Sequence, residues 1–168
     1  MTKLIVGLLL AFAIAVTPNA LTPTMAKTAG GSIAASPAAV VPGWKDSRQI
    51  SPEELSKKLS GPVAGRPVIL QVGVKVLYDG AHIRGAIFAG PASTAVGLAR
   101  LKAVAAKLAR DKEVTIYCGC CPWGKCPNVH PAYDELRKMG FSKLVVLLIP
   151  QDFARDWIGA GLPVERKK

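Results

Sequence analysis

The stretch EVTIYCGCCPWGKCPNVHPAYDEL, residues 113–136, carries all four cysteines of the chain close together. They are Cys118, Cys120, Cys121 and Cys126. A short run typical of a β-strand precedes them, and a run typical of a helix follows. Three kinds of site fit this pattern: a metal cage, a disulfide pair with spare thiols, or a reactive-sulfur loop with one nucleophile.

Strand-type and helix-type runs also alternate along the rest of the chain. Short apolar runs predict strands at residues 67–73, 86–90, 113–117 and 143–149. Capping signals and helical spacing predict helices at residues 52–60, 94–110, 131–139 and 152–158, while residues 74–85 read as a loop. The strands are apolar on both faces, which predicts an α/β protein with a mostly parallel central sheet and helices on both faces. Sites in such sheets lie at the carboxyl ends of strands, and Cys118 occupies one of those ends.

The first 26 residues have the composition of a targeting segment and not of a folded domain. Residues 4–16, LIVGLLLAFAIAV, form an uninterrupted apolar run after Lys3. This run is short for a bilayer span and suits the core of a signal peptide, with an uncleaved anchor as the alternative. We therefore expect a signal peptide at residues 1–26, a flexible linker at 27–47 and the folded domain at 48–168. The expected location is periplasmic or secreted, with no stable membrane span after signal removal.

The chain is basic, with a formal net charge of +11. Residues 1–26 contain one Lys and no acidic residue, so their removal leaves +10. The positive charges are scattered, apart from the tail at residues 166–168, and no aromatic-basic stripe accompanies them. This distribution gives no indication of a nucleic-acid partner. It is typical of a solvated basic surface, which attracts small anions or an anionic membrane.

Three segments of the chain, taken in order, carry a resemblance to a known family. The first is VILQVGVKVLYDGAHIRGAIFAG at residues 68–90, which contains a signature around His82 and Gly85. The second is VTIYC with its loop and following helix, and the third is KLVVLLIPQDFARDWIGAGLPVE at residues 143–165. Together they resemble a single rhodanese (sulfurtransferase) domain. The resemblance covers residues 50–165 and implies the rhodanese-like fold.

The sequence departs from the family pattern at several places. Gln71 and Gly73 stand where the family usually has Asp and Arg, and Arg84 replaces the Pro of the middle signature. The loop after Cys118 is longer than usual and contains Lys125 as its only cation, with no Arg.

The resemblance implies that Cys118 is the catalytic nucleophile of a sulfurtransferase. Its thiolate would take sulfane sulfur from a small anion such as thiosulfate, hold it as a persulfide and pass it to a thiol or another nucleophile. A thiolate at a strand end, facing loop amides and a helix N-terminus, is expected to have a lowered pKa. The same resemblance implies a structural role for His82 and Gly85. The expected active-site loop comprises Gly119, Cys120, Cys121, Trp123, Gly124, Lys125, Cys126 and Asn128.

Two other functions stay open from the residues alone. Cys118 and Cys121 have the C-x-x-C spacing of redox pairs, and Cys121 and Cys126 are candidates for a resolving or disulfide role, which indicates a thiol-disulfide or persulfide carrier. Four thiolates also suit copper or zinc in a non-catalytic binding module, with His130 as a further candidate ligand. We assign no metal ligand and no cofactor from the sequence, because the adjacent Cys120 and Cys121 rarely both reach one tetrahedral ion.

Overall fold

The computed structural model describes residues 47–167. The predicted signal peptide at residues 1–26 lies outside the described residues, and so does the predicted linker at 27–47 except for Ser47. Among residues 47–167, none of the helices reaches the length and hydrophobicity that a bilayer crossing requires.

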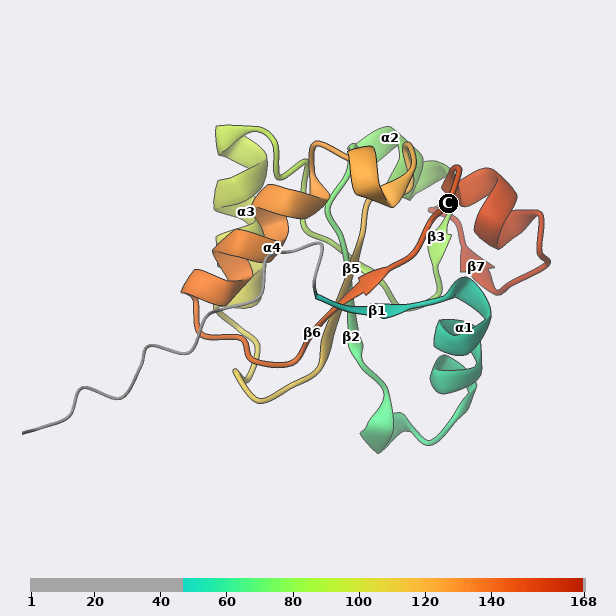
Figure 1. Cartoon of the computed structure of the whole chain (residues 1–168), viewed down its shortest axis with the longest axis horizontal. Coiled ribbons are helices and arrows are strands. Elements are labelled where there is room, and N and C mark those ends of the chain that lie inside the picture. The colour runs from blue at the N-terminus through green and yellow to red at the C-terminus, as the bar shows by residue number, and fades with distance from the viewer. Residues whose placement is uncertain (1–46, 168) are drawn as a thin grey trace, which may run out of the picture. The chain divides into compact units, whose positions relative to one another are not determined.

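A five-stranded sheet forms the centre of the domain (Figure 1). Its strand order is β1-β6-β5-β2-β4, and every neighbouring pair is parallel. A separate antiparallel pair joins β3 to β7. The strands are β1 (Arg48–Ile50), β2 (Val68–Gln71), β3 (His82–Ile83), β4 (Ile87–Phe88), β5 (Val114–Tyr117), β6 (Leu144–Leu147) and β7 (Val164–Glu165). The predicted mostly parallel α/β sheet is confirmed.

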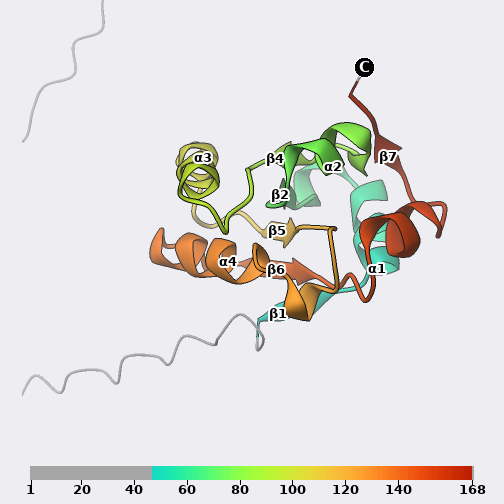
Figure 2. The ribbon, with the colours of Figure 1, turned by 90° about the horizontal axis from the view of Figure 1, so that it is seen from above.

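Helices cover both faces of this sheet (Figure 2). Helices α3 and α4 pack on one face, while α1 and the π-helix η4 pack on the other. Successive strand residues point to opposite faces, so Val146 joins the buried cluster under α3 and α4, and Val145 joins the cluster under α1 and η4. The helices are α1 (Pro52–Ser60), α2 (Lys75–Gly80), α3 (Ala95–Ala105), α4 (Val129–Lys138) and η4 (Ala154–Ile158), with 3₁₀ turns η2 (Val63–Gly65) and η3 (Trp123–Lys125).

The start of α1 shows how local sequence sets an element. The Ser51 hydroxyl accepts from the Glu54 amide at 3.2 Å, and the Glu54 carboxylate accepts from the Ser51 amide at 3.0 Å. Pro52 occupies the first turn, where no intrahelical N–H is needed. The capping box expected from the sequence is therefore present.

Several expected elements differ from the structure, and three of the differences have a clear physical description. The prediction of a loop at residues 74–85 was wrong, because this segment contains α2 and β3, and both are too short to produce a periodic pattern. Helix α3 ends at Ala105 instead of residue 110. Helix α4 begins at Val129, before Pro131, because a proline is tolerated in a first turn whose amides have no intrahelical partner.

Candidate functional site

Cys118 directly follows β5, whose four residues are all buried. The Val72 amide donates to the Tyr117 carbonyl at 2.8 Å, so pairing with the chain after β2 continues to the end of β5. The Gln71 side-chain amide donates to the Cys118 carbonyl at 3.1 Å. A Cβ at Gly73 would lie 2.7 Å from the Cys118 sulfur, so glycine leaves the room that this sulfur needs. These contacts hold Cys118 at the carboxyl end of the central strand.

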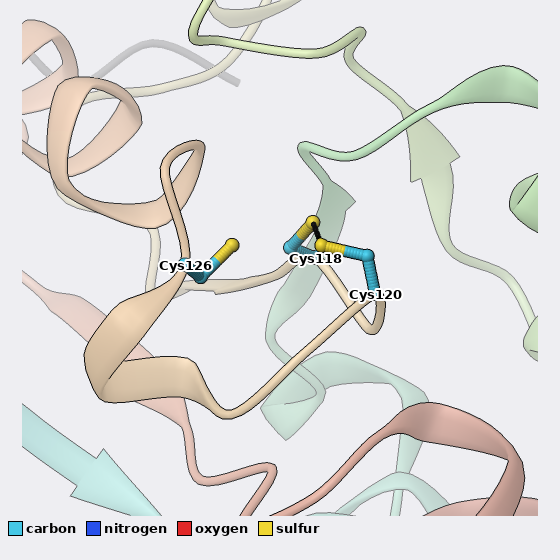
Figure 3. A group of neighbouring side chains, drawn as sticks. All are labelled: Cys118, Cys120 and Cys126. Atoms are coloured by element: carbon cyan, nitrogen blue, oxygen red, sulfur yellow. Dashed lines mark hydrogen bonds between the residues drawn. The ribbon is translucent and has the colours of Figure 1, made fainter.

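Three sulfur atoms converge beside this strand end (Figure 3). The Sγ atoms of Cys118, Cys120 and Cys126 all lie within 4.8 Å of one another. The Cys118 Sγ is 3.2 Å from the Cys120 Sγ, which is 3.1 Å from the Cys121 Sγ. Cys118 and Cys126 are buried, Cys120 is exposed, and all four cysteines are free thiols. The C-x-x-C spacing in the sequence indicated Cys118 and Cys121 as a candidate redox pair, whereas in the structure the Cys118 sulfur contacts the Cys120 sulfur.

Hydrogen-bond donors from the start of α4 surround the buried sulfurs. The Asn128 Nδ2 donates to the Cys118 Sγ at 3.4 Å, and the Asn128 Oδ1 accepts from the Ser93 amide at 3.0 Å. Asn128 is the N-cap residue of α4, yet its side chain makes no capping bond, since it forms this bridge instead. The amides of Asn128 and Val129 donate toward Cys126. The helix N-terminus therefore presents N–H groups to sulfur, an arrangement that stabilises negative charge.

The two buried thiols titrate as a pair. Hydrogen bonding from the Cys118 thiol, helped by the amides of Asn128 and Val129, lowers the pKa of Cys126 to about 6 against the opposing effect of burial. The pKa of Cys118 is raised, because its proton is held by Cys126, burial disfavours its thiolate, and the Cys126 charge repels a second one. Burial is the first cause that raises the pKa of Cys121 to about 12. The lowered pKa predicted for Cys118 therefore belongs to Cys126.

The long loop after Cys118 is attached to the domain at two points. Gly119 has a φ of +85°, and a Cβ there would lie 2.8 Å from the Cβ of Phe153, whose amide donates to the Gly119 carbonyl at 3.1 Å. Farther along, the Trp123 amide donates to the Ile149 carbonyl at 2.9 Å. The Trp123 ring is half-buried and packs against the cluster under α3 and α4, whereas Lys125 in η3 is exposed. Both contacts join the loop to the segment that follows β6.

A cavity of about 530 Å³ opens at Cys118 and Cys120. Mostly apolar side chains line it, including Leu77 from α2 and Phe153 before η4. Among its described lining residues, Arg166 is the only cation. The cavity is larger than a small inorganic anion needs, and lies in the size range of ordinary ligand pockets.

Comparisons with known proteins bear on the fold. No family model and no curated protein matches the chain. Protein BH2092 from Bacillus halodurans is similar in structure, with a TM-score of 0.56, 20% identity, and 73% of this chain and 79% of that chain covered. The rhodanese-like domain of Alr3790 from Anabaena has a TM-score of 0.50 at 22% identity, covering 71% of this chain and 80% of that one. A crystal structure of Alr3790 has a TM-score of 0.52 at 20% identity, covering 70% and 92%.

The chain has a rhodanese-like fold. Together with the clustered thiols at the end of β5, this fold supports a cysteine-based function. The resemblance predicted from the sequence is thus confirmed at the level of the fold.

Other predicted residues of the rhodanese-like domain lie outside the lining of the sulfur cavity. The His82 Nδ1 lies 2.7 Å from the Tyr78 carbonyl, and its ring stacks on the Tyr78 ring at 3.8 Å. Gly85 has a φ of +76°, and its amide donates to Glu165 at 3.1 Å. These contacts tie β3 to α2 and β7. His130 is exposed, with its Nε2 2.9 Å from the Asp134 carboxylate.

Several residues that shape the site at Cys118 are not predicted from the sequence. Gln71 and Gly73 stand out in the sequence only as departures from the family pattern, and Arg166 only as part of a basic tail. Gly73 lies two residues after β2, and a glycine in or beside a strand often marks close backbone approach, so the importance of Gly73 could have been predicted. The proximity of Arg166 to the cavity comes from the fold alone.

Proposed function

We propose that this protein is a sulfurtransferase in which Cys118 carries sulfane sulfur as a persulfide. The observation that carries the proposal is the position of Cys118. Cys118 directly follows a buried central strand, and its sulfur accepts a hydrogen bond from the Asn128 side-chain amide and borders an open cavity. The rhodanese-like fold of the Alr3790 domain supports the same reading.

The proposed reaction has two displacement steps at sulfur. The Cys118 thiolate attacks the outer sulfur of a thiosulfate-like donor, a new S–S bond forms, and sulfite leaves with the electron pair of the broken bond. An acceptor thiolate then attacks the outer persulfide sulfur, takes it, and releases Cys118 as a thiolate. Sulfur and charge balance in both steps, so neither requires an external oxidant or reductant.

Cys126 has a clear part in this scheme. Cys118 borders the cavity and has a raised pKa, whereas Cys126 is buried and has a lowered pKa. As Cys118 attacks, its proton passes to the Cys126 thiolate, which acts as the adjacent base that activates a nucleophile. Arg166 at the cavity is suited to hold the anionic donor.

The test is the rate of thiocyanate formation from thiosulfate and cyanide by the full chain. Wild-type protein is expected to turn over, and Cys118→Ser is expected to lose on the order of 10³-fold or more, as nucleophile replacements do. Loss of turnover in Cys120→Ser with full turnover in Cys118→Ser would refute the assignment. Circular dichroism of both variants separates a chemical loss from misfolding.

One observation favours a second candidate function, thiol-disulfide exchange. The sulfurs of Cys118 and Cys120 are 3.2 Å apart, so oxidation would join neighbours that already touch. This alternative predicts a reducible disulfide and dithiol exchange without thiosulfate turnover. Mass mapping of alkylated peptides from oxidised protein distinguishes a Cys118–Cys120 bridge from an intact persulfide.

We also propose that the chain is exported. The support is the apolar run at residues 4–16 after Lys3. N-terminal sequencing of the mature protein from a periplasmic or culture fraction tests this, and full-length chain in the cytoplasmic fraction would contradict it.

A further inference from the structure

The convergence of three thiols is more than sulfur transfer requires. A persulfide carrier needs one nucleophile and one base, yet Cys120 also turns its sulfur toward Cys118 and Cys126 (Figure 3). The three side chains come from separate places along the loop: directly after β5, at its first turn, and after η3. The fold therefore brings together a soft ligand set that no single sequence motif supplies.

The spacing of these sulfurs fits one metal ion. Metal–thiolate bonds of about 2.3 Å place the three sulfurs of a trigonal site about 4 Å apart. The three Sγ atoms lie within 4.8 Å of one another. The Cys118–Cys120 separation is 3.2 Å, and a rotation of the exposed Cys120 side chain would widen it to that spacing. Sulfurs this close surround a single ion.

The number of ligands discriminates between soft metals. Structural zinc is almost always bound by four ligands in a tetrahedron. Among the described residues, the group of mutually close ligand atoms contains three sulfurs, and neither Cys121 nor His130 belongs to it. The Cys121 Sγ touches the Cys120 Sγ at 3.1 Å but lies outside the mutually close group, so the group itself offers three thiolates. Three thiolates suit monovalent copper, which soft sulfur ligands select.

The surroundings of the sulfurs suit the negative charge of such a complex. Three thiolates and one Cu⁺ carry a net negative charge, which would be costly in an apolar core without donors. Here the Asn128 side-chain amide faces Cys118, and the amides of Asn128 and Val129 face Cys126. The burial of Cys118 and Cys126 keeps water away from the ion on that side.

We propose that Cys118, Cys120 and Cys126 form a three-coordinate thiolate site for Cu(I). Binding forms three Cu–S bonds, and the protons still held by the thiols pass to solvent. Copper enters and remains as Cu(I), so no electron is transferred. The site goes beyond the proposed sulfur transfer and does not depend on it. Because both uses need the Cys118 sulfur, bound Cu(I) excludes persulfide formation.

The test is an anaerobic competition between the reduced full chain and a chromophoric Cu(I) chelator, bathocuproine disulfonate. We expect wild-type protein to retain one Cu(I) per chain. Cys120→Ser removes an exposed ligand without disturbing the core, and it should weaken binding by more than the roughly 10–100-fold that loss of an outer-shell partner costs. Cys121→Ser is the matched control, because it makes the same change at the next residue, outside the ligand group, and should retain copper.

Two results would overturn the copper site. One is a wild-type chain that yields all its Cu(I) to the chelator or retains only Zn²⁺. The other is a Cys121→Ser variant that loses as much copper as Cys120→Ser. An assay of sulfur transfer by copper-free wild-type protein distinguishes failure of the copper site from failure of the proposed sulfurtransferase function. Normal transfer without copper binding removes the copper site alone, and copper binding without transfer removes the proposed function alone.

Discussion

Replacing Gly73 with alanine should displace the reacting sulfur. The new Cβ would lie 2.7 Å from the Cys118 Sγ and 2.9 Å from the Cys118 carbonyl oxygen. Unstrained contacts between such atoms are about 3.5–4.0 Å, so the sulfur must move by about 1 Å. A displacement of that size at a reacting atom costs roughly 100-fold in rate. We therefore expect kcat/KM for sulfur transfer to fall about 100-fold in Gly73→Ala.

Stability should change much less than activity. Overpacking a well-packed site costs about 1–3 kcal/mol in the free energy of unfolding, which urea denaturation measures. Gly65→Ala is the matched control, since no atom lies within 4 Å of the Cβ it would add and its backbone needs no positive φ. A Gly73→Ala variant with wild-type kcat/KM would show that this glycine does not make room for the reacting sulfur.

Three further predictions follow from the surroundings of Cys118. The rate of sulfur transfer should rise with pH through about 6, because Cys126 must lose its proton to serve as base. In Cys126→Ser this rise should move above pH 9.0, since burial still raises the pKa of Cys118. The pH–rate profiles of both proteins test this prediction. Asn128→Ala should lower the free energy of unfolding by about 1–3 kcal/mol, because it leaves the Ser93 amide unpaired. Asn128→Asp should keep the bond to Ser93 but slow sulfur transfer, because it places a carboxylate beside the Cys118 sulfur. Equal losses of stability in the two variants would contradict the bridge from Ser93 to Cys118. Arg166→Gln should raise the KM for thiosulfate roughly 2–5-fold and leave kcat unchanged, as expected for an exposed charge at the cavity. If the KM difference between wild type and variant did not shrink with added salt, the cause would not be electrostatic.

The regular part of the fold was predictable from local signals. Strands β2, β5 and β6 are buried on both faces, and such strands appear in sequence as short continuous apolar runs. The start of helix α1 was predictable from its capping box. By contrast, β1 and β7 have too few residues to produce a pattern, and they exist because a partner strand supplies their hydrogen bonds.

The site was predictable only in part. The position of Cys118 at a strand end follows from alternation of strands and helices, and the sequence placed it there. Cys126 has a lowered pKa and Cys118 a raised one because it is the Cys126 sulfur that faces the amides at the start of α4. The spacing of the cysteines in the sequence does not reveal which sulfur faces these amides. The same holds for Asn128, whose side chain leaves its capping position to bridge Ser93 and Cys118.

Intact mass is the most direct measure of whether Cys118 carries a persulfide. Full-length chain, freed of copper and purified without reductant, would be weighed before and after exposure to thiosulfate, beside Cys118→Ser. We expect wild-type protein to gain one sulfur atom, which dithiothreitol removes and which Cys118→Ser never shows. A wild-type mass that thiosulfate leaves unchanged, or an equal gain in Cys118→Ser, would contradict it.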